Sequence, residues 1–115
     1  MPKPIGKFNS IVLAVKDMKK SVKFYRDVLS FEVVEKYDEW SELKAGNFYV
    51  GLYEGKPKPA GTIFPTIEVK DIQKTANELK RKKVKFVDEP YEEDYGWLAI
   101  FEDPDGYLFE LFQEK

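Results

Sequence analysis

A short stretch of sequence occurs twice in this chain, and this repeat constrains the fold more than any other feature. The segment VKDMKKS at residues 15–21 returns as VKDIQKT at residues 69–75, 54 positions further along. Each copy follows a strand-like apolar run and opens a helix-like one. Asp17 and Asp71 stand where a helix N-cap would accept from the first unpaired amides. The repeat predicts two tandem copies of one supersecondary unit.

The hydrophobic periodicity gives each copy the order β-α-β-β-β. In the first module we expect a helix at residues 18–29 and strands at 9–15, 31–37, 40–44 and 48–53. In the second we expect a helix at residues 72–82 and strands at 62–69, 84–87, 96–101 and 107–112. Hairpin turns are expected at 38–39 and 45–47, and a solvated acidic loop at 88–94. The fold class is therefore α+β in a single domain, residues 1–115, with module one at about 8–54, a linker at about 55–61 and module two at about 62–113.

Alternation along the strands separates an apolar face from a mixed one. The apolar face suits the two amphipathic helices. The mixed face, with its rings, small residues and few polar groups, is typical of a pocket lining, but a face covered by a second subunit has the same pattern. The candidate ligand contacts on it are Ser10, Tyr49, Gly51, Tyr53, Phe64, Glu110 and Phe112, with Trp97 and Phe101 added from a strand whose parity no motif fixes.

The chain contains no cysteine and no histidine, and this excludes several chemistries. Disulfides, thiolate nucleophiles and triads with an imidazole base are ruled out, and the commonest transition-metal ligand is missing. The net charge of −2 and the pI near 5.3 give no reason to expect nucleic acid or an anionic membrane as a partner. Without a signal peptide or a run of roughly 20 apolar residues, the expected location is the cytoplasm.

Three segments resemble the vicinal oxygen chelate superfamily, which includes glyoxalases, bleomycin resistance proteins and dihydroxybiphenyl dioxygenases. They are IVLAVKD at residues 11–17 with the ring pair Phe24-Tyr25 downstream, the second joint VKD at 69–71, and FEDPDGYLFEL at 101–111. The resemblance implies two tandem βαβββ modules forming a curved mixed sheet around a cavity.

The resemblance also implies four inward ligand positions, one on each of strands one, four, five and eight. Metal-dependent members carry His or Gln, Glu, His and Glu there. In this chain the positions fall on Ser10, Gly51, Phe64 and Glu110. One carboxylate is not a metal site, so we expect no metal and no cofactor, as in the metal-free, bleomycin-resistance-like branch.

The function that fits best at this stage is sequestration of a small aromatic compound, as in antibiotic resistance, by a homodimer. A cationic compound would pair with Glu110 and stack on the neighbouring rings. An alternative is a glyoxalase-like lyase or isomerase in which Glu110 is the catalytic acid or base, assisted by Tyr49 or Tyr53. A third is a scaffold whose pocket is filled by its own side chains.

Overall fold

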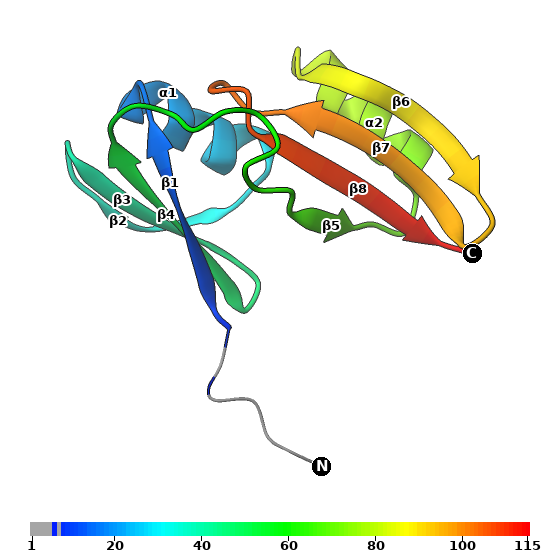
Figure 1. Cartoon of the computed structure of the whole chain (residues 1–115), viewed down its shortest axis with the longest axis horizontal. Helices are drawn as coiled ribbons and strands as arrows, with labels where there is room; N and C mark the ends of the chain where they lie inside the picture. Colours follow the sequence, from blue (N-terminus) through cyan, green and yellow to red (C-terminus); the bar gives the residue numbers. More distant parts are fainter. Residues whose placement is uncertain (1–5, 7) are drawn as a thin grey trace. The chain divides into compact units, whose positions relative to one another are not determined.

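The chain folds into two units with the same order of elements. The structure is a computed structural model that describes residue 6 and residues 8–115. The chain divides between Pro57 and Lys58 into two compact units, and each has the order β-α-β-β-β (Figure 1). The predicted pair of tandem modules is therefore confirmed. Across these described residues, none of the helices has the length and apolar character needed to cross a membrane.

The first unit is a four-stranded mixed sheet with one helical segment. Its elements are β1 Ser10–Val15, α1 Met18–Lys23, η1 Phe24–Val28, β2 Glu32–Lys36, β3 Trp40–Ala45 and β4 Phe48–Glu54. The strand order is β1-β4-β3-β2, in which β1 and β4 are parallel and the other pairs antiparallel. The single α-helix expected here is in fact α1 followed by the π-helix η1, in which Leu29 N donates to Phe24 O at 3.2 Å.

The second unit repeats this topology. Its elements are β5 Thr66–Glu68, α2 Ile72–Arg81, β6 Lys85–Glu93, β7 Gly96–Glu102 and β8 Leu108–Glu114, in the strand order β5-β8-β7-β6. The predicted strand at 62–69 is too long, because Thr62 forms a turn by donating its Oγ1 to Pro59 O at 2.6 Å. Pro65 then has no N–H to give to a ladder, so pairing begins at Thr66.

The acidic segment from Asp88 to Asp94 was expected to be a loop, and this prediction is wrong for most of it. Residues 88–93 continue β6, which pairs with β7 along its length. The register shifts between Phe86 and Asp88 and again between Asp88 and Tyr91. Such irregularities and the edge position of β6 accommodate Pro90, which cannot donate to a partner strand.

Each helix covers one face of its own sheet. The side chains of Asp17 and Asp71 accept from Lys20 N and Lys74 N, both at 3.1 Å, which confirms the two predicted N-caps. α1 packs on β3 and β4, and α2 packs on β6, β7 and β8 (Figure 1). We call the opposite side of each sheet its helix-free face, and it carries most of the candidate site residues.

Candidate functional site

The strand register of the first unit arranges its helix-free face as three rows of three residues. The rows, read from β3 through β4 to β1, are Trp40-Tyr53-Ala14, Glu42-Gly51-Val12 and Lys44-Tyr49-Ser10. The predicted contacts Ser10, Tyr49, Gly51 and Tyr53 therefore share one surface. Gly51 lies at the centre of it, where the absence of a side chain leaves room for a neighbouring group.

That room is taken by the indole of Trp40. A Cβ atom added at Gly51 would lie 3.0 Å from Trp40 Cζ3 and 3.2 Å from Cζ2, and closer still to Cη2. The ring thus lies over the strand-four position at which the family resemblance implies a glutamate ligand. Trp40 was not among the predicted site residues. The two-residue turn Gly46-Asn47 was the signal that could have revealed it. This turn pairs Ala45 with Phe48, and counting residue pairs along the hairpin from there places Trp40 opposite Tyr53.

A small pocket opens at the other end of the same face. It has a volume of about 270 Å³ and is lined by Asn9, Ser10, Val34, Glu42 and Tyr49. Lys44 places its Nζ 6.0 Å from the centroid of the Tyr49 ring. The pocket therefore combines a carboxylate, a hydroxyl, a phenol and an amide, and Glu42 was also missed at the level of sequence.

The helix-free face of the second unit carries Glu110. Its Cα partners are Thr66 on β5 and Ile100 on β7, and its Oε1 accepts a hydrogen bond from Thr66 Oγ1 at 2.9 Å. Phe112 follows on the same face, and its ring centroid is 6.2 Å from that of Tyr95. Phe64 precedes β5 and is half exposed. The second unit thus places the Glu110 carboxylate on the same face as aromatic rings.

Tyr91 on β6 belongs to this electrostatic environment. Its Cα partner is Leu98, which in turn pairs with Phe112, so Tyr91 shares the helix-free face. Burial raises the pKa of the Tyr91 phenol, and the carboxylates of Asp88 and Glu93 raise it further, followed by Tyr95 and Glu110. The negative charges of Asp88, Glu93 and Glu110 repel any further negative charge, whether on the Tyr91 phenol or on a bound anion. This face therefore attracts cations rather than anions.

Trp97 and Phe101 do not lie on the face of Glu110, and their predicted placement is wrong. In the β7–β8 ladder Phe101 pairs with Phe109 and Trp97 with Gln113, whereas Glu110 pairs with Ile100. Phe101 is fully buried, and its ring stacks on Phe109 with centroids 5.4 Å apart. Both side chains therefore belong to the helix-covered side of the second sheet.

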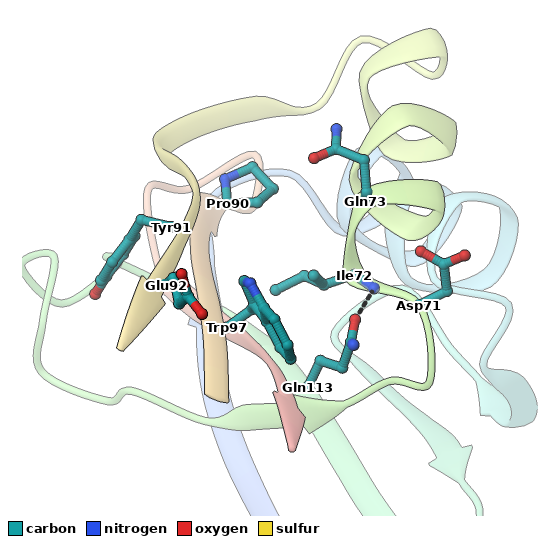
Figure 2. Close-up of a pocket in the computed structure, with 8 residues that line it drawn as sticks. All are labelled: Asp71, Ile72, Gln73, Pro90, Tyr91, Glu92, Trp97 and Gln113. Carbon is teal, nitrogen blue, oxygen red and sulfur yellow. Dashed lines mark hydrogen bonds between the residues drawn. The ribbon is translucent and has the colours of Figure 1, made fainter. Parts of the chain in front are cut away.

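Trp97 instead lines a separate pocket of about 440 Å³ beside the start of α2 (Figure 2). There Ile72 N donates to Gln113 Oε1 at 2.8 Å. Lys115 lies with its Nζ 5.4 Å from the Trp97 ring centroid and 2.8 Å from Oε2 of Glu92, so two of the lining residues already contact a cation. Tyr91 borders this pocket through its backbone segment, but Figure 2 shows its ring directed away from it.

The four positions that the family resemblance assigns to metal ligands do not form a donor set in either unit. Gly51 and Phe64 offer no side-chain donor, Ser10 offers a hydroxyl, and Glu110 is already bonded to Thr66. Within residues 6 and 8–115, no group of three or more Asp or Glu side chains gathers closely enough to hold a metal ion. The residues present do not fit a family-type metal centre.

Comparison with known proteins agrees with this fold. The model of the Glyoxalase/Bleomycin resistance protein/Dioxygenase superfamily matches residues 7–111. A probable lactoylglutathione lyase from Synechocystis sp. is 30% identical, over 89% of this chain and 91% of that protein. The crystal structure of TnmS3, an antibiotic binding protein from Streptomyces sp. CB03234, covers 99% of this chain and 100% of its own, with a TM-score of 0.84 and 21% identity. The fosfomycin resistance protein FosX from Listeria monocytogenes gives a TM-score of 0.86 at 18% identity, over 97% and 96% of the two chains.

Proposed function

The chain belongs to the glyoxalase/bleomycin resistance protein/dioxygenase superfamily, and on this premise we propose that it binds and sequesters a small aromatic compound without using a metal ion. The observation that carries the proposal is the replacement of metal donors by ring surface. The indole of Trp40 covers Gly51, and Phe64 stands at a second ligand position. In either unit, an aromatic ring at such a position can stack on an aromatic ligand and gain from its burial.

The charge of the second unit supports a cationic ligand. Glu110 keeps a carboxylate on the helix-free face and has Phe112 as its neighbour on that face. The pKa of Tyr91 is raised by burial first, and then by the negative charges of Asp88, Glu93 and Glu110. A cation bound here would offset this negative charge and stack on a ring at the same time. Two solved structures with this fold are named for antibiotic binding and for fosfomycin resistance, and we propose by analogy a role in resistance to a toxic small molecule.

The experiment is a thermal-shift screen of flat aromatic compounds in cationic, neutral and anionic versions of matched size. A ligand at a hundred times its dissociation constant adds about 2.7 kcal/mol to the free energy of unfolding. That corresponds to a shift in Tm of several degrees for a domain of this size. We expect cations to give the largest shifts.

The variant that tests Glu110 is Glu110→Gln, which keeps the shape and lets the side-chain oxygen still accept from Thr66. It should reduce the shift for cations and leave neutral ligands unaffected. Glu78→Gln on the exposed side of α2 is the matched control, because it removes the same charge away from the helix-free face. Larger shifts with anions, or unchanged cation shifts in Glu110→Gln, would contradict the proposed role of Glu110.

A lyase activity is the second candidate, and the relative named as a probable lactoylglutathione lyase is what favours it. In this chain such an activity would depend on Glu110 as acid or base, because the metal donors are replaced. Turnover of the hemithioacetal of methylglyoxal and glutathione, abolished in Glu110→Gln, would support it. We expect no turnover, and elemental analysis of the dialysed protein should detect no stoichiometric zinc, manganese, nickel or iron.

A further inference from the structure

Glu42 is a carboxylate that the proposed function does not use. It lies on β3 between Trp40 and Lys44, and its Cα partners are Gly51 on β4 and the exposed Glu35 on β2. Because Gly51 has no side chain, the ring of Trp40 is the group that extends over this part of the face. Glu42 also lines the pocket that contains Ser10 and Tyr49. The Glu42 carboxylate is thus placed between two aromatic side chains beside an open volume.

The charge of Glu42 has no partner in the described part of the chain. Among residues 6 and 8–115, no hydrogen bond or ion pair reaches its carboxylate, although the side chain is half buried. Lys44 is the nearest cation along the strand, but its Nζ is associated with the Tyr49 ring and makes no ion pair with Glu42. A carboxylate that loses part of its hydration without gaining a partner raises the free energy of the site, and a bound cation would lower it.

The chemistry of the surroundings selects among cations. A calcium or magnesium ion needs about six oxygen ligands, and this pocket supplies one carboxylate with a hydroxyl, a phenol and an amide. An organic ammonium group requires fewer fixed bonds, because it is attracted by a carboxylate and by the faces of Trp and Tyr rings together. The volume of about 270 Å³ leaves room for the alkyl substituents of such a group.

We propose that the helix-free face of the first unit binds an organic ammonium group, with Glu42 supplying the charge and the rings of Trp40 and Tyr49 supplying the contact surface. This inference rests on the proposed function, since it takes the helix-free faces to be ligand-binding surfaces. It adds a second charged group, located in the first unit, that sets the class of ligand independently of Glu110.

The test uses the two tryptophans of the chain. In the variant Trp97→Phe, Trp40 is the one remaining tryptophan, so indole fluorescence reports on the first unit alone. The probe is benzyltrimethylammonium, titrated by fluorescence and by isothermal calorimetry, with benzyl alcohol and benzenesulfonate as the neutral and anionic counterparts. We expect a saturable change in Trp40 emission for the cation and none for the anion.

The substitution Glu42→Gln should weaken binding of the cation about tenfold, as expected for loss of a partly desolvated charge beside aromatic rings. Glu42→Asp keeps the charge and should restore most of the affinity, which separates a charge effect from a folding defect. Glu54→Gln, an exposed carboxylate on the opposite face of the same sheet, is the control and should bind as the parent does.

The outcomes separate this inference from the proposed function. Loss of binding in Glu42→Gln with binding retained in Glu110→Gln supports it. Loss in Glu110→Gln with no change in Glu42→Gln overturns it and leaves the proposed function standing. Absence of any saturable response to benzyltrimethylammonium also overturns it, while a Tm shift with neutral aromatic compounds would still support sequestration.

Discussion

Replacing Gly51 with alanine tests the contact on which the view of the first unit depends. The added Cβ would lie 3.0 Å from Trp40 Cζ3 and closer to Cη2, well inside normal contact distance. The backbone at Gly51 is not in the left-handed region, so alanine itself introduces no strain there. The substitution therefore acts by displacing the indole ring of Trp40.

The size of the effect follows from two opposing terms. Lifting the ring off β4 exposes on the order of 100 Å² of apolar surface, which costs about 2.5 kcal/mol. Alanine in place of glycine in a strand returns about 0.5–1 kcal/mol through the lower entropy of the unfolded chain. We expect Gly51→Ala to lower the free energy of unfolding by about 1.5–2 kcal/mol.

The assay is urea denaturation followed by Trp40 fluorescence in a Trp97→Phe background, so that the first unit is observed even if the two units unfold separately. Emission of folded Gly51→Ala should move toward that of hydrated indole. The control is a double-mutant cycle with Trp40→Ala, in which unfolding of all four variants is followed by far-UV circular dichroism because two of them contain no tryptophan. Without the ring, Gly51→Ala should be neutral or stabilising. An equal loss of stability with and without Trp40, or no loss at all, would refute the proposed contact.

Three further predictions concern other parts of the chain. Ser41 is fully buried in β3, and its hydroxyl has no hydrogen-bond partner among the residues that the structure describes. Ser41→Ala should therefore raise the free energy of unfolding, measured by urea denaturation, by about 1 kcal/mol. A decrease would show that the hydroxyl is hydrogen-bonded. Burial and then nearby acids raise the pKa of Tyr91. The contribution of Tyr91 to the free energy of unfolding is therefore complete below about pH 10, the pKa of the unfolded chain, and is lost as the pH rises through the pKa of Tyr91 in the folded state. Glu110→Gln should lower that pKa in an absorbance titration assigned with Tyr91→Phe, and an unchanged value would place Glu110 too far away. We also predict a twofold homodimer, because Val12, Tyr53 and Tyr95 are 54%, 40% and 61% exposed; light scattering that gives the 13.5 kDa mass of one chain at micromolar concentration would contradict this.

The fold was predictable from the sequence because its signals are local and occur twice. The N-cap residues Asp17 and Asp71 act within one turn of their helices, and each repeat carries the same apolar periodicity. The acidic part of β6 was missed for a physical reason. The acidic side chains of residues 88–94 indicate contact with water. An edge strand exposes its side chains to water as a loop does, so composition alone does not distinguish the two.

The site was less predictable because it depends on register between strands. The faces of Trp97 and Phe101 follow from the turn between β7 and β8, in which Asp103 Oδ1 accepts from Asp105 N and Tyr107 N, both at 2.9 Å. The sequence identifies the turn but does not state that Glu102 pairs with Leu108, and a shift of one residue reverses every side chain. The contact between the Trp40 ring and Gly51 depends on where the indole points along the face. Strand alternation predicts the face on which a side chain lies but not this direction.

The π-helix in the first unit also has a consequence for how the two halves diverged. Asp71 stands 54 positions after Asp17, but Lys83 stands only 53 positions after Ser30. Ser30 and Lys83 are equivalent ends, since both have positive φ, 61° and 65°, and both lie two residues before the next strand. The first helical segment therefore contains one residue more than the second between matching ends, and an extra residue in a regular α-helix would rotate everything after it by about 100°. The wider turn of η1 absorbs this insertion, so that Met18 and Val22 before it and Tyr25 within it are all buried.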